Sequence, residues 1–287
     1  MKKHLLFLLF IIFSECTESN LAFHSGTNPS DGILKLAKNF GGSKNDVAKS
    51  VVSTLDGGFA VLGYTQSIDG DVTDKATEDY DFWMLKFDSE AQLEWNKTYG
   101  GSGDDRGSSI IETSDGGYAL LGYSDSADGD VSSNNGNRDF WLVKITASGV
   151  LSWQKSFGYA GLDEGVSVIE TSDNHLMLSG VLDVTASGGE GNQGRLYNRH
   201  AGGDYWSIKI TPIGDIVWSR FYGGTFTDSP TGIKETLNNG FISVGGSDSN
   251  DVDISNNKGS YDFWIVKSNL NGDIVWEKSF GGSEIDE

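Results

Sequence analysis

Short apolar segments, separated by turns rich in glycine and aspartate, follow one another along almost the whole chain. In one representative stretch they predict strands at 108–113, 118–124, 140–146 and 150–157. The segments Ser114-Asp115-Gly116-Gly117 and Ala147-Ser148-Gly149 between them are typical of tight hairpin turns. The pattern therefore predicts an all-β protein made of four-stranded antiparallel units.

The second and third strands of each predicted unit are nearly continuous apolar runs, such as Phe59-Ala60-Val61-Leu62 and Phe140-Trp141-Leu142-Val143. An antiparallel strand with one face in water should alternate between apolar and polar residues, so both faces of these sheets must be covered. Radially stacked blades cover both faces without helices, whereas a parallel β-helix would show a shorter period.

The units repeat with a period of about 60 residues. An aromatic-glycine step marks the start of each unit, and the aromatic residues are Phe40, Tyr99, Phe157, Tyr222 and Phe280, with a fifth unit only begun at the last of them. Six residues after each aromatic comes an aspartate: Asp46, Asp105, Asp163, Asp228 and Asp286. A second aspartate opens an Asp-Phe/Tyr-Trp motif at Asp81, Asp139, Asp204 and Asp262, and a further tryptophan follows each motif at Trp95, Trp153, Trp218 and Trp276. All eight tryptophans thus fall into two columns, which makes them scaffold residues.

These motifs carry a family resemblance. The segment from Tyr99 to Asp105, followed by Asp115-Gly116-Gly117-Tyr118 and Leu121-Gly122-Tyr123-Ser124, resembles the bacterial seven-bladed β-propeller (SBBP-type) repeat family of exported surface proteins and lipoproteins. The hairpin Gly214-Asp215-Ile216-Val217-Trp218 is also similar to hairpins of pyrroloquinoline quinone enzymes and Asp-box propellers. The resemblance implies a β-propeller. It implies no single activity, because propellers host many functions.

The number of strands raises the question of ring closure. The segment Ile33–Phe40 matches the fourth strand of a unit, which makes five such strands against four each of the other three. We expect four complete units plus a redundant strand, with a truncated or open ring, or one completed by a second chain. A closed four-bladed ring with one extra edge strand is the alternative.

The first residues indicate export. Lys2 and Lys3 precede the apolar run Leu5–Phe13, which has the length of a secretory signal and is too short to span a bilayer. The sequence predicts a signal peptide at 1–15, a polar tether at 16–32 and propeller repeats at 33–287. Cys16, the only cysteine, lies where bacterial lipoproteins are lipidated, although Glu15 departs from the usual small residue there. The alternatives are an outer-membrane or cell-surface lipoprotein and a periplasmic or secreted protein cleaved nearby, for example after Ala22.

The charge balance narrows the range of partners. With 21 lysines and arginines against 41 aspartates and glutamates, the formal net charge is −20, which disfavours nucleic acid and anionic lipid surfaces. We expect no transmembrane span, no nucleic-acid partner, and a protein or glycan as ligand.

Two sets of residues are candidates for a site. Aspartate pairs stand between the second and third strands of three units, at Asp69 and Asp71, Asp128 and Asp130, and Asp251 and Asp253. Carboxylates at this spacing can converge on calcium, but Asp-Gly-Asp is also ordinary turn chemistry. The aspartates repeated in every unit suggest structural caps, because a catalytic carboxylate is normally unique.

The third unit differs from the others, and asymmetry is more informative about function than repetition. Its longer loop at 183–203 carries the candidate ligand residues Arg195, Tyr197, Arg199 and His200 in an otherwise acidic chain. A decorated loop without function is the alternative. We expect a non-catalytic exported interaction or scaffold module that presents its loops to a glycan, peptide or envelope partner. The other hypothesis is an extracytoplasmic enzyme, either carbohydrate-active or quinone-dependent.

Overall fold

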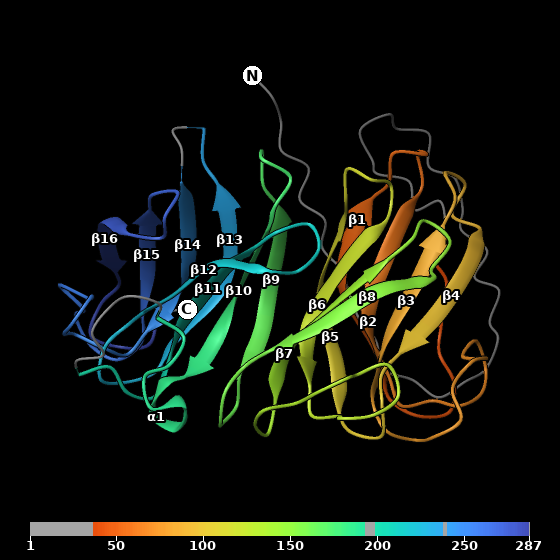
Figure 1. Ribbon diagram of the computed structural model, residues 1–287, viewed down its shortest axis with the longest axis horizontal. Coiled ribbons are helices and arrows are strands. Elements are labelled where there is room, and N and C mark those ends of the chain that lie inside the picture. Colours follow the sequence, from red (N-terminus) through yellow and green to blue (C-terminus); the bar gives the residue numbers. More distant parts are fainter. Residues whose placement is uncertain (1–36, 193–198, 238–239, 287) are drawn as a thin grey trace, which may run out of the picture. The chain divides into compact units, whose positions relative to one another are not determined.

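The computed structural model describes residues 37–192, 199–237 and 240–286, and the compact unit Asn39–Glu287 holds four antiparallel four-stranded sheets (Figure 1). We call the sheets blades 1 to 4. Blade 1 contains β1 (Asp46–Ser53), β2 (Phe59–Thr65), β3 (Asp81–Phe87) and β4 (Leu93–Tyr99). Blade 2 contains β5 (Asp105–Glu112), β6 (Tyr118–Ser124), β7 (Asp139–Ile145) and β8 (Leu151–Phe157).

Blades 3 and 4 follow the same order. Blade 3 contains β9 (Glu164–Glu170), β10 (Leu176–Asp183), β11 (Gly203–Ile210) and β12 (Ile216–Tyr222). Blade 4 contains β13 (Asp228–Glu235), β14 (Phe241–Ser247), β15 (Asp262–Ser268) and β16 (Ile274–Phe280). The one helix in the described part of the chain, α1 (Val184–Ser187), lies in the long loop of blade 3. The predicted all-β fold of four-stranded units is confirmed.

Strand boundaries differ from the predicted ones by a few residues. In blade 2 the first strand begins at Asp105, three residues before the predicted start, because Asp105 itself pairs with Ser124. The hairpins have the predicted turn chemistry, since Gly116 has φ 80° and its backbone N–H donates to the carbonyl of Thr113 at 2.8 Å. In blade 3 Asn174 takes the equivalent left-handed position with φ 61°.

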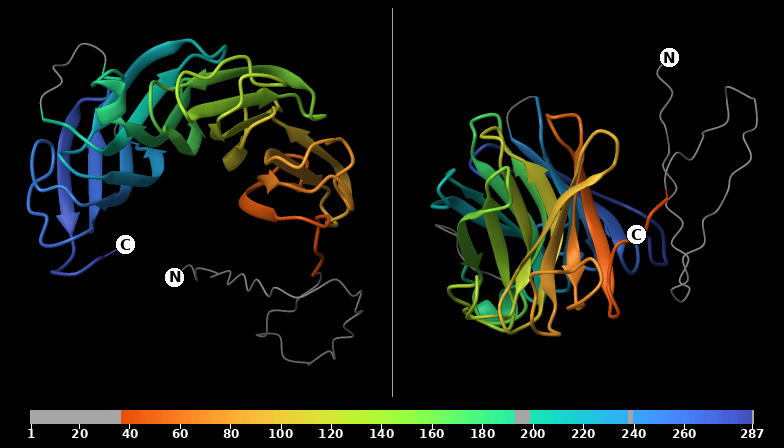
Figure 2. Two further views of the ribbon diagram at one scale, coloured as in Figure 1. Left: turned by 90° about the horizontal axis from the view of Figure 1, so that it is seen from below. Right: turned by 90° about the vertical axis from the view of Figure 1, so that its right-hand side faces the viewer.

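The first strand of every blade lies on the inner side of an arc (Figure 2). Strands β1, β5, β9 and β13 contact one another in sequence, and each of β5, β9 and β13 also touches the second strand of the preceding blade. The fourth strands lie further apart, toward the outside of the arc. Blades 1 and 4 form its two ends and do not meet in Figure 2, so this unit is an open arc.

The same aromatic contact joins each pair of neighbouring blades. Phe82 of blade 1 meets Trp141 of blade 2 edge-on with ring centroids 4.7 Å apart. Phe140 meets Trp206 at 4.9 Å, and Tyr205 meets Trp264 at 4.8 Å. Such pairs contribute about 0.5–1.5 kcal/mol beyond the area that they bury. The tryptophans of the Asp-Phe/Tyr-Trp motif are thus scaffold residues, and this explains why every unit has one.

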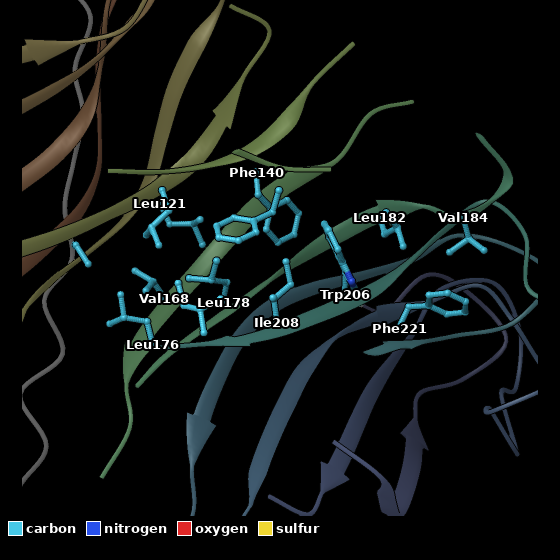
Figure 3. Close-up of a cluster of buried hydrophobic side chains, with 14 residues drawn as sticks. Leu121, Phe140, Val168, Leu176, Leu178, Leu182, Val184, Trp206, Ile208 and Phe221 are labelled. Atoms are coloured by element: carbon cyan, nitrogen blue, oxygen red, sulfur yellow. The ribbon is translucent and has the colours of Figure 1, made fainter. Parts of the chain in front are cut away.

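Apolar side chains fill the space around these contacts. Between blades 2 and 3, Leu121 and Phe140 face Val168, Leu178 and Trp206 (Figure 3), all of them buried. Both faces of the central sheets are therefore covered by neighbouring blades, which accounts for the continuous apolar runs in their middle strands.

Half of the segment Ile33–Phe40, predicted as a redundant fourth strand, lies outside the described residues. Its described part, residues 37–40, is not in a strand. Phe40 packs edge-on against Phe87 of blade 1 at 5.2 Å.

Candidate functional site

The three predicted aspartate pairs lie at one end of the sheets, against the loops that carry the aromatic-glycine steps. In blade 2 the second carboxylate, of Asp130, accepts the backbone N–H of Gly100 at 3.2 Å, and the first, of Asp128, accepts that of Ser102 at 2.7 Å. The matching pairs Asp69 and Asp71, and Asp251 and Asp253, bind the backbone N–H groups of Ser43 and Gly41, and of Thr225 and Gly223. The carboxylates therefore hold two loops together, as aspartates in turns commonly do.

These contacts do not test the calcium prediction. Within the described residues no group of three or more histidine, cysteine, aspartate or glutamate side chains is arranged to hold a metal ion. Calcium binding by the pairs stays a prediction. Their hydrogen bonds to backbone N–H groups give them a second, purely structural role.

The aspartate six residues after each aromatic residue caps the loop that precedes it. Its Oδ2 atom accepts the backbone N–H four residues earlier, at 2.7 Å for Asp105, and at 2.8 Å for Asp46, Asp163 and Asp228. In blade 2 Ser126 donates to the same oxygen at 2.8 Å. The repeated contact supports the structural role predicted for this column.

The aspartates of the Asp-Phe/Tyr-Trp motif are buried, and one oxygen of each lacks a hydrogen-bond partner: Asp81, Asp139, Asp204 and Asp262. This oxygen lies against the glycine of the aromatic-glycine step, so that a Cβ atom on Gly158 would come within 2.2 Å of Oδ1 of Asp139. Burial raises the pKa of Asp139 to about 6 and that of Asp204 to about 7. A buried carboxylate with few hydrogen bonds resists ionisation in this way.

The counterion of this aspartate differs between blades. In blade 1 the buried Nζ atom of Lys75 lies 2.9 Å from Oδ2 of Asp81, yet burial still raises the pKa of Asp81 to about 7. In blade 3, Nδ1 of His200 lies 2.6 Å from Oδ2 of Asp204. In blade 2, Asp139 has only the backbone N–H of Asn135, at 2.8 Å.

The structure separates the four residues of the predicted ligand loop. Arg195 and Tyr197 lie outside the described residues. Arg199, at φ 71°, pairs with Asp251 of blade 4 at 3.2 Å and has a side chain that is 70% exposed. His200 is buried, with its ring bonded to Asp204 and packed edge-on against Phe221, so it anchors the end of the loop to blade 3. Of the two described residues, only Arg199 is open to a ligand.

A second group of residues, whose two arginines have no counterpart in the other blades, lies at the same end of the sheets and crosses blades 1 and 2. We call Tyr64, Tyr80, Arg106, Tyr123 and Arg138 the arginine–tyrosine row. The guanidinium of Arg106 lies 5.0 Å from the ring centroid of Tyr64 and 4.2 Å from that of Tyr80. Arg138 lies 4.3 Å from the ring centroid of Tyr123. Cations at these distances are attracted to the aromatic faces.

Carboxylates fix the two arginines in place. Asp104 accepts two hydrogen bonds from Arg106, at 2.7 and 2.9 Å, and Arg138 pairs with Glu164 of blade 3. The arginine side chains keep about a third of their surface exposed, 31% for Arg106 and 30% for Arg138. Burial raises the pKa of Tyr123 to about 12, so its phenol stays protonated. The two guanidinium groups of the row thus offer preorganised donors to a ligand, whereas Tyr123, 8% exposed, supports Arg138 from within.

Reasoning from the sequence missed this row because its residues are dispersed between 64 and 138. A signal was nevertheless present. The position after the capping aspartate is arginine only in the second unit, where the others have Val47, Glu164 and Ser229. Arg106 could have been identified by searching each column of the repeat for a residue that differs from its equivalents in the other units.

The residues that bear on export lie outside the described part of the chain, including Cys16 and the predicted signal peptide. Across the described residues, no helix is long and apolar enough to cross a membrane.

Comparisons with known proteins leave the family open. No protein-family model matches the chain, and no curated protein does. A search of solved structures finds similarity to a protein of unknown function from Bacteroides caccae, with 9% sequence identity, 81% of each chain covered and a TM-score of 0.39. The four antiparallel four-stranded sheets themselves define a propeller-like array of blades, and no family is assigned.

Proposed function

We propose that this chain is a non-catalytic, exported interaction module that binds a glycan or peptide of the cell envelope through the arginine–tyrosine row. The observation that carries the proposal is the asymmetry of the row. Its two arginines are absent from the equivalent positions of the other blades, whereas the tryptophan and aspartate columns recur throughout. A scaffold position recurs with the repeat, and a recognition position need not.

The chemistry of the row suits recognition. Tyrosine and arginine dominate the energetics of many binding surfaces, because they combine apolar area with hydrogen-bond donors. The ion pairs of Arg106 with Asp104 and of Arg138 with Glu164 hold both guanidinium groups before a ligand arrives. Preorganisation of this kind reduces the entropy that binding would otherwise cost.

The enzyme alternative has less support. Three carboxylates with raised pKa values, Asp139, Asp204 and Asp228, are each 0% exposed and belong to repeated columns. A general acid or base must come within hydrogen-bond distance of its substrate, which these buried groups cannot do in this structure.

The proposal is tested by applying the purified protein to an array of envelope glycans and peptides and measuring the affinity of each ligand found. The double variant R106Q/R138Q should weaken binding by about tenfold or more, the effect of losing a central contact. The matched control is K155Q, which removes a cation of blade 2 that pairs with Asp215 at 3.0 Å, on a different strand from either arginine. Equal affinity in the double variant and the wild type would refute the siting, and turnover of a ligand would refute the non-catalytic assignment.

Export forms a separate part of the proposal. It is supported by Lys2, Lys3, the run Leu5–Phe13 and the position of Cys16. Expression in a bacterial host with a labelled fatty acid should label the wild type and leave C16S unlabelled. Equal labelling of both would exclude lipidation at Cys16.

A further inference from the structure

The charged groups of the arginine–tyrosine row and its neighbours alternate in sign. Arg106 donates from Nε and Nη2 to the two oxygens of Asp104, at 2.7 and 2.9 Å. Nη2 of Arg138 lies 3.7 Å from Oδ2 of the same carboxylate, and Nη1 of Arg138 donates to Oε1 of Glu164. A ligand that lies along these groups therefore meets a cation, an anion, a second cation and a second anion in turn.

Two further charges border these groups and balance each other. Nζ of Lys49 lies 5.9 Å from the ring centroid of Tyr64, and the carboxylate of Asp125 accepts the backbone N–H of Asp104. The three cations and three anions sum to a formal charge of zero, in a chain whose formal net charge is −20: Lys49, Arg106, Arg138, Asp104, Asp125 and Glu164. An anionic ligand would meet a carboxylate beside each guanidinium and would be repelled by the chain as a whole.

The two ends of this alternating series keep unused hydrogen-bonding capacity. Within the described residues, Nη1 of Arg106 donates to no protein group and Oε2 of Glu164 accepts from none. The side chain of Arg106 is 31% exposed and that of Glu164 is 40% exposed. A hydroxyl group can serve either of them, because it both donates and accepts, and hydrogen bonds to ionised groups are the strong ones. The successive hydroxyls of a saccharide therefore match a surface on which donors and acceptors alternate.

A peptide fits the row less well. Tyr64 and Tyr123 lie on β2 and β6, which are paired on both sides, so no strand edge is open there for an added peptide strand. Leu162, 47% exposed, forms a β-bridge with Arg138, but a single exposed apolar side chain is ordinary on a protein surface. The described residues of the row thus offer a peptide neither a strand edge at Tyr64 and Tyr123 nor a group of apolar side chains.

We propose that the arginine–tyrosine row recognises an uncharged saccharide rich in hydroxyl groups, an inference that rests on the binding function proposed above. The guanidinium groups of Arg106 and Arg138 donate to its hydroxyls, and Glu164 accepts from them. Because such a ligand has no charge, its affinity should change by less than about twofold between roughly 50 and 500 mM salt, whereas an anionic ligand held by the arginines would lose several-fold by screening.

Glu164 distinguishes the two kinds of ligand by the direction of one effect. E164Q removes the negative charge beside Arg138 and leaves an amide, which is a weaker acceptor than a carboxylate. An uncharged saccharide should bind E164Q about threefold to tenfold more weakly, whereas an anionic ligand would bind it more tightly, since the guanidinium is no longer neutralised.

The chain offers a matched control on the same strand. Glu164 begins β9 and Glu170 ends it, so the two carboxylates lie at opposite ends of blade 3 (Figure 1). Glu170 accepts the backbone N–H of Ser114 at 2.8 Å and is not part of the row. E170Q should therefore bind the ligand as the wild type does.

Calorimetric titration of the purified protein tests the proposal. The probes are uncharged oligosaccharides of glucose, mannose and galactose, oligogalacturonate as the anionic counterpart of the galactose series, and a panel of uncharged peptides. At least one uncharged oligosaccharide should bind, R106Q and E164Q should each weaken it, and neither E170Q nor salt should change it. No binding by any uncharged oligosaccharide at millimolar concentration, preference for oligogalacturonate or a peptide, or tighter binding by E164Q would overturn the proposal.

The variants also separate this inference from the binding function on which it rests. A peptide or oligogalacturonate whose affinity falls in R106Q/R138Q would leave the row as a binding site and overturn only its preference for an uncharged saccharide. A saccharide that binds R106Q/R138Q and the wild type equally would overturn both.

Discussion

Replacement of Asp139 by asparagine should remove a pH dependence that is built into the junction between blades 2 and 3. The side chain is 0% exposed, its Oδ1 atom has no hydrogen-bond partner, and its Oδ2 atom accepts one backbone N–H, from Asn135. Burial raises the pKa of this carboxyl from 3.8 to about 6. The folded protein therefore binds this proton more tightly than the unfolded chain does. The resulting stabilisation is present at low pH and is lost as the pH rises through about 6.

The size of the effect follows from the two pKa values. Between pH 5 and pH 8 the loss of this proton lowers the free energy of unfolding by at most about 1.4 kcal/mol. For a chain of this length the loss corresponds to roughly 3–6 °C in Tm. Asparagine keeps an acceptor for the N–H of Asn135 and has no charge to bury, so D139N should lose this part of the pH dependence.

The assay is urea unfolding of the wild type and D139N at pH 5 and pH 8. The control D215N removes a carboxylate on the surface, with a side chain that is 64% exposed, and should leave the pH dependence unchanged. If D139N shows the same difference between the two pH values as the wild type, the buried carboxylate is not the source of the effect.

Three further predictions concern other parts of the scaffold. A Cβ atom on Gly122 would lie 1.9 Å from the carbonyl oxygen of Arg106, whereas one on Gly116 would meet nothing within 4 Å. We expect G122A to lower the free energy of unfolding by about 3 kcal/mol or more and G116A by about 1 kcal/mol, the latter from its positive φ, and similar values for both would contradict this account. Burial lowers the pKa of His200, but the hydrogen bond and the charge of Asp204 raise it by more. The pKa of His200 therefore lies above its ordinary value of 6.5. An NMR titration should therefore find its midpoint above 6.5, with the stabilisation lost at higher pH, and a midpoint below 6.5 would show that burial dominates. Because the aspartate pairs already bind backbone N–H groups, we expect a chelator to leave Tm unchanged, and a rise of Tm in millimolar calcium would favour the metal prediction instead.

The fold was largely predictable because each of its stabilising motifs recurs in every blade. The aromatic-glycine step, the capping aspartate and the paired tryptophans each appear once per blade. Because the same contact is made in every blade, the same residue type recurs at the equivalent position of every unit. The helix α1 could not be predicted in this way. It is a single turn, capped by Asp183 through the N–H of Ala186 at 2.9 Å, and the described residues of the other blades contain no helix.

The candidate site was less predictable, for a physical reason. Arg106 gains its aromatic neighbours Tyr64 and Tyr80 only through the stacking of blade 2 on blade 1, so its departure from the repeat marks the residue but does not reveal these contacts. The loop of the third unit drew attention because its basic residues are adjacent in sequence. His200 proves to be a buried partner of Asp204, a role that its position in a long polar loop did not indicate.

Binding measurements on the variants of the arginine–tyrosine row test the central claim most directly. For a glycan or peptide that binds the wild type, R106Q and R138Q should each weaken affinity, the double variant should weaken it most, and K155Q should have no effect. The comparison requires near-ultraviolet circular dichroism to show that all four variants keep the tryptophan packing of the wild type. Wild-type affinity in the folded double variant would contradict the account.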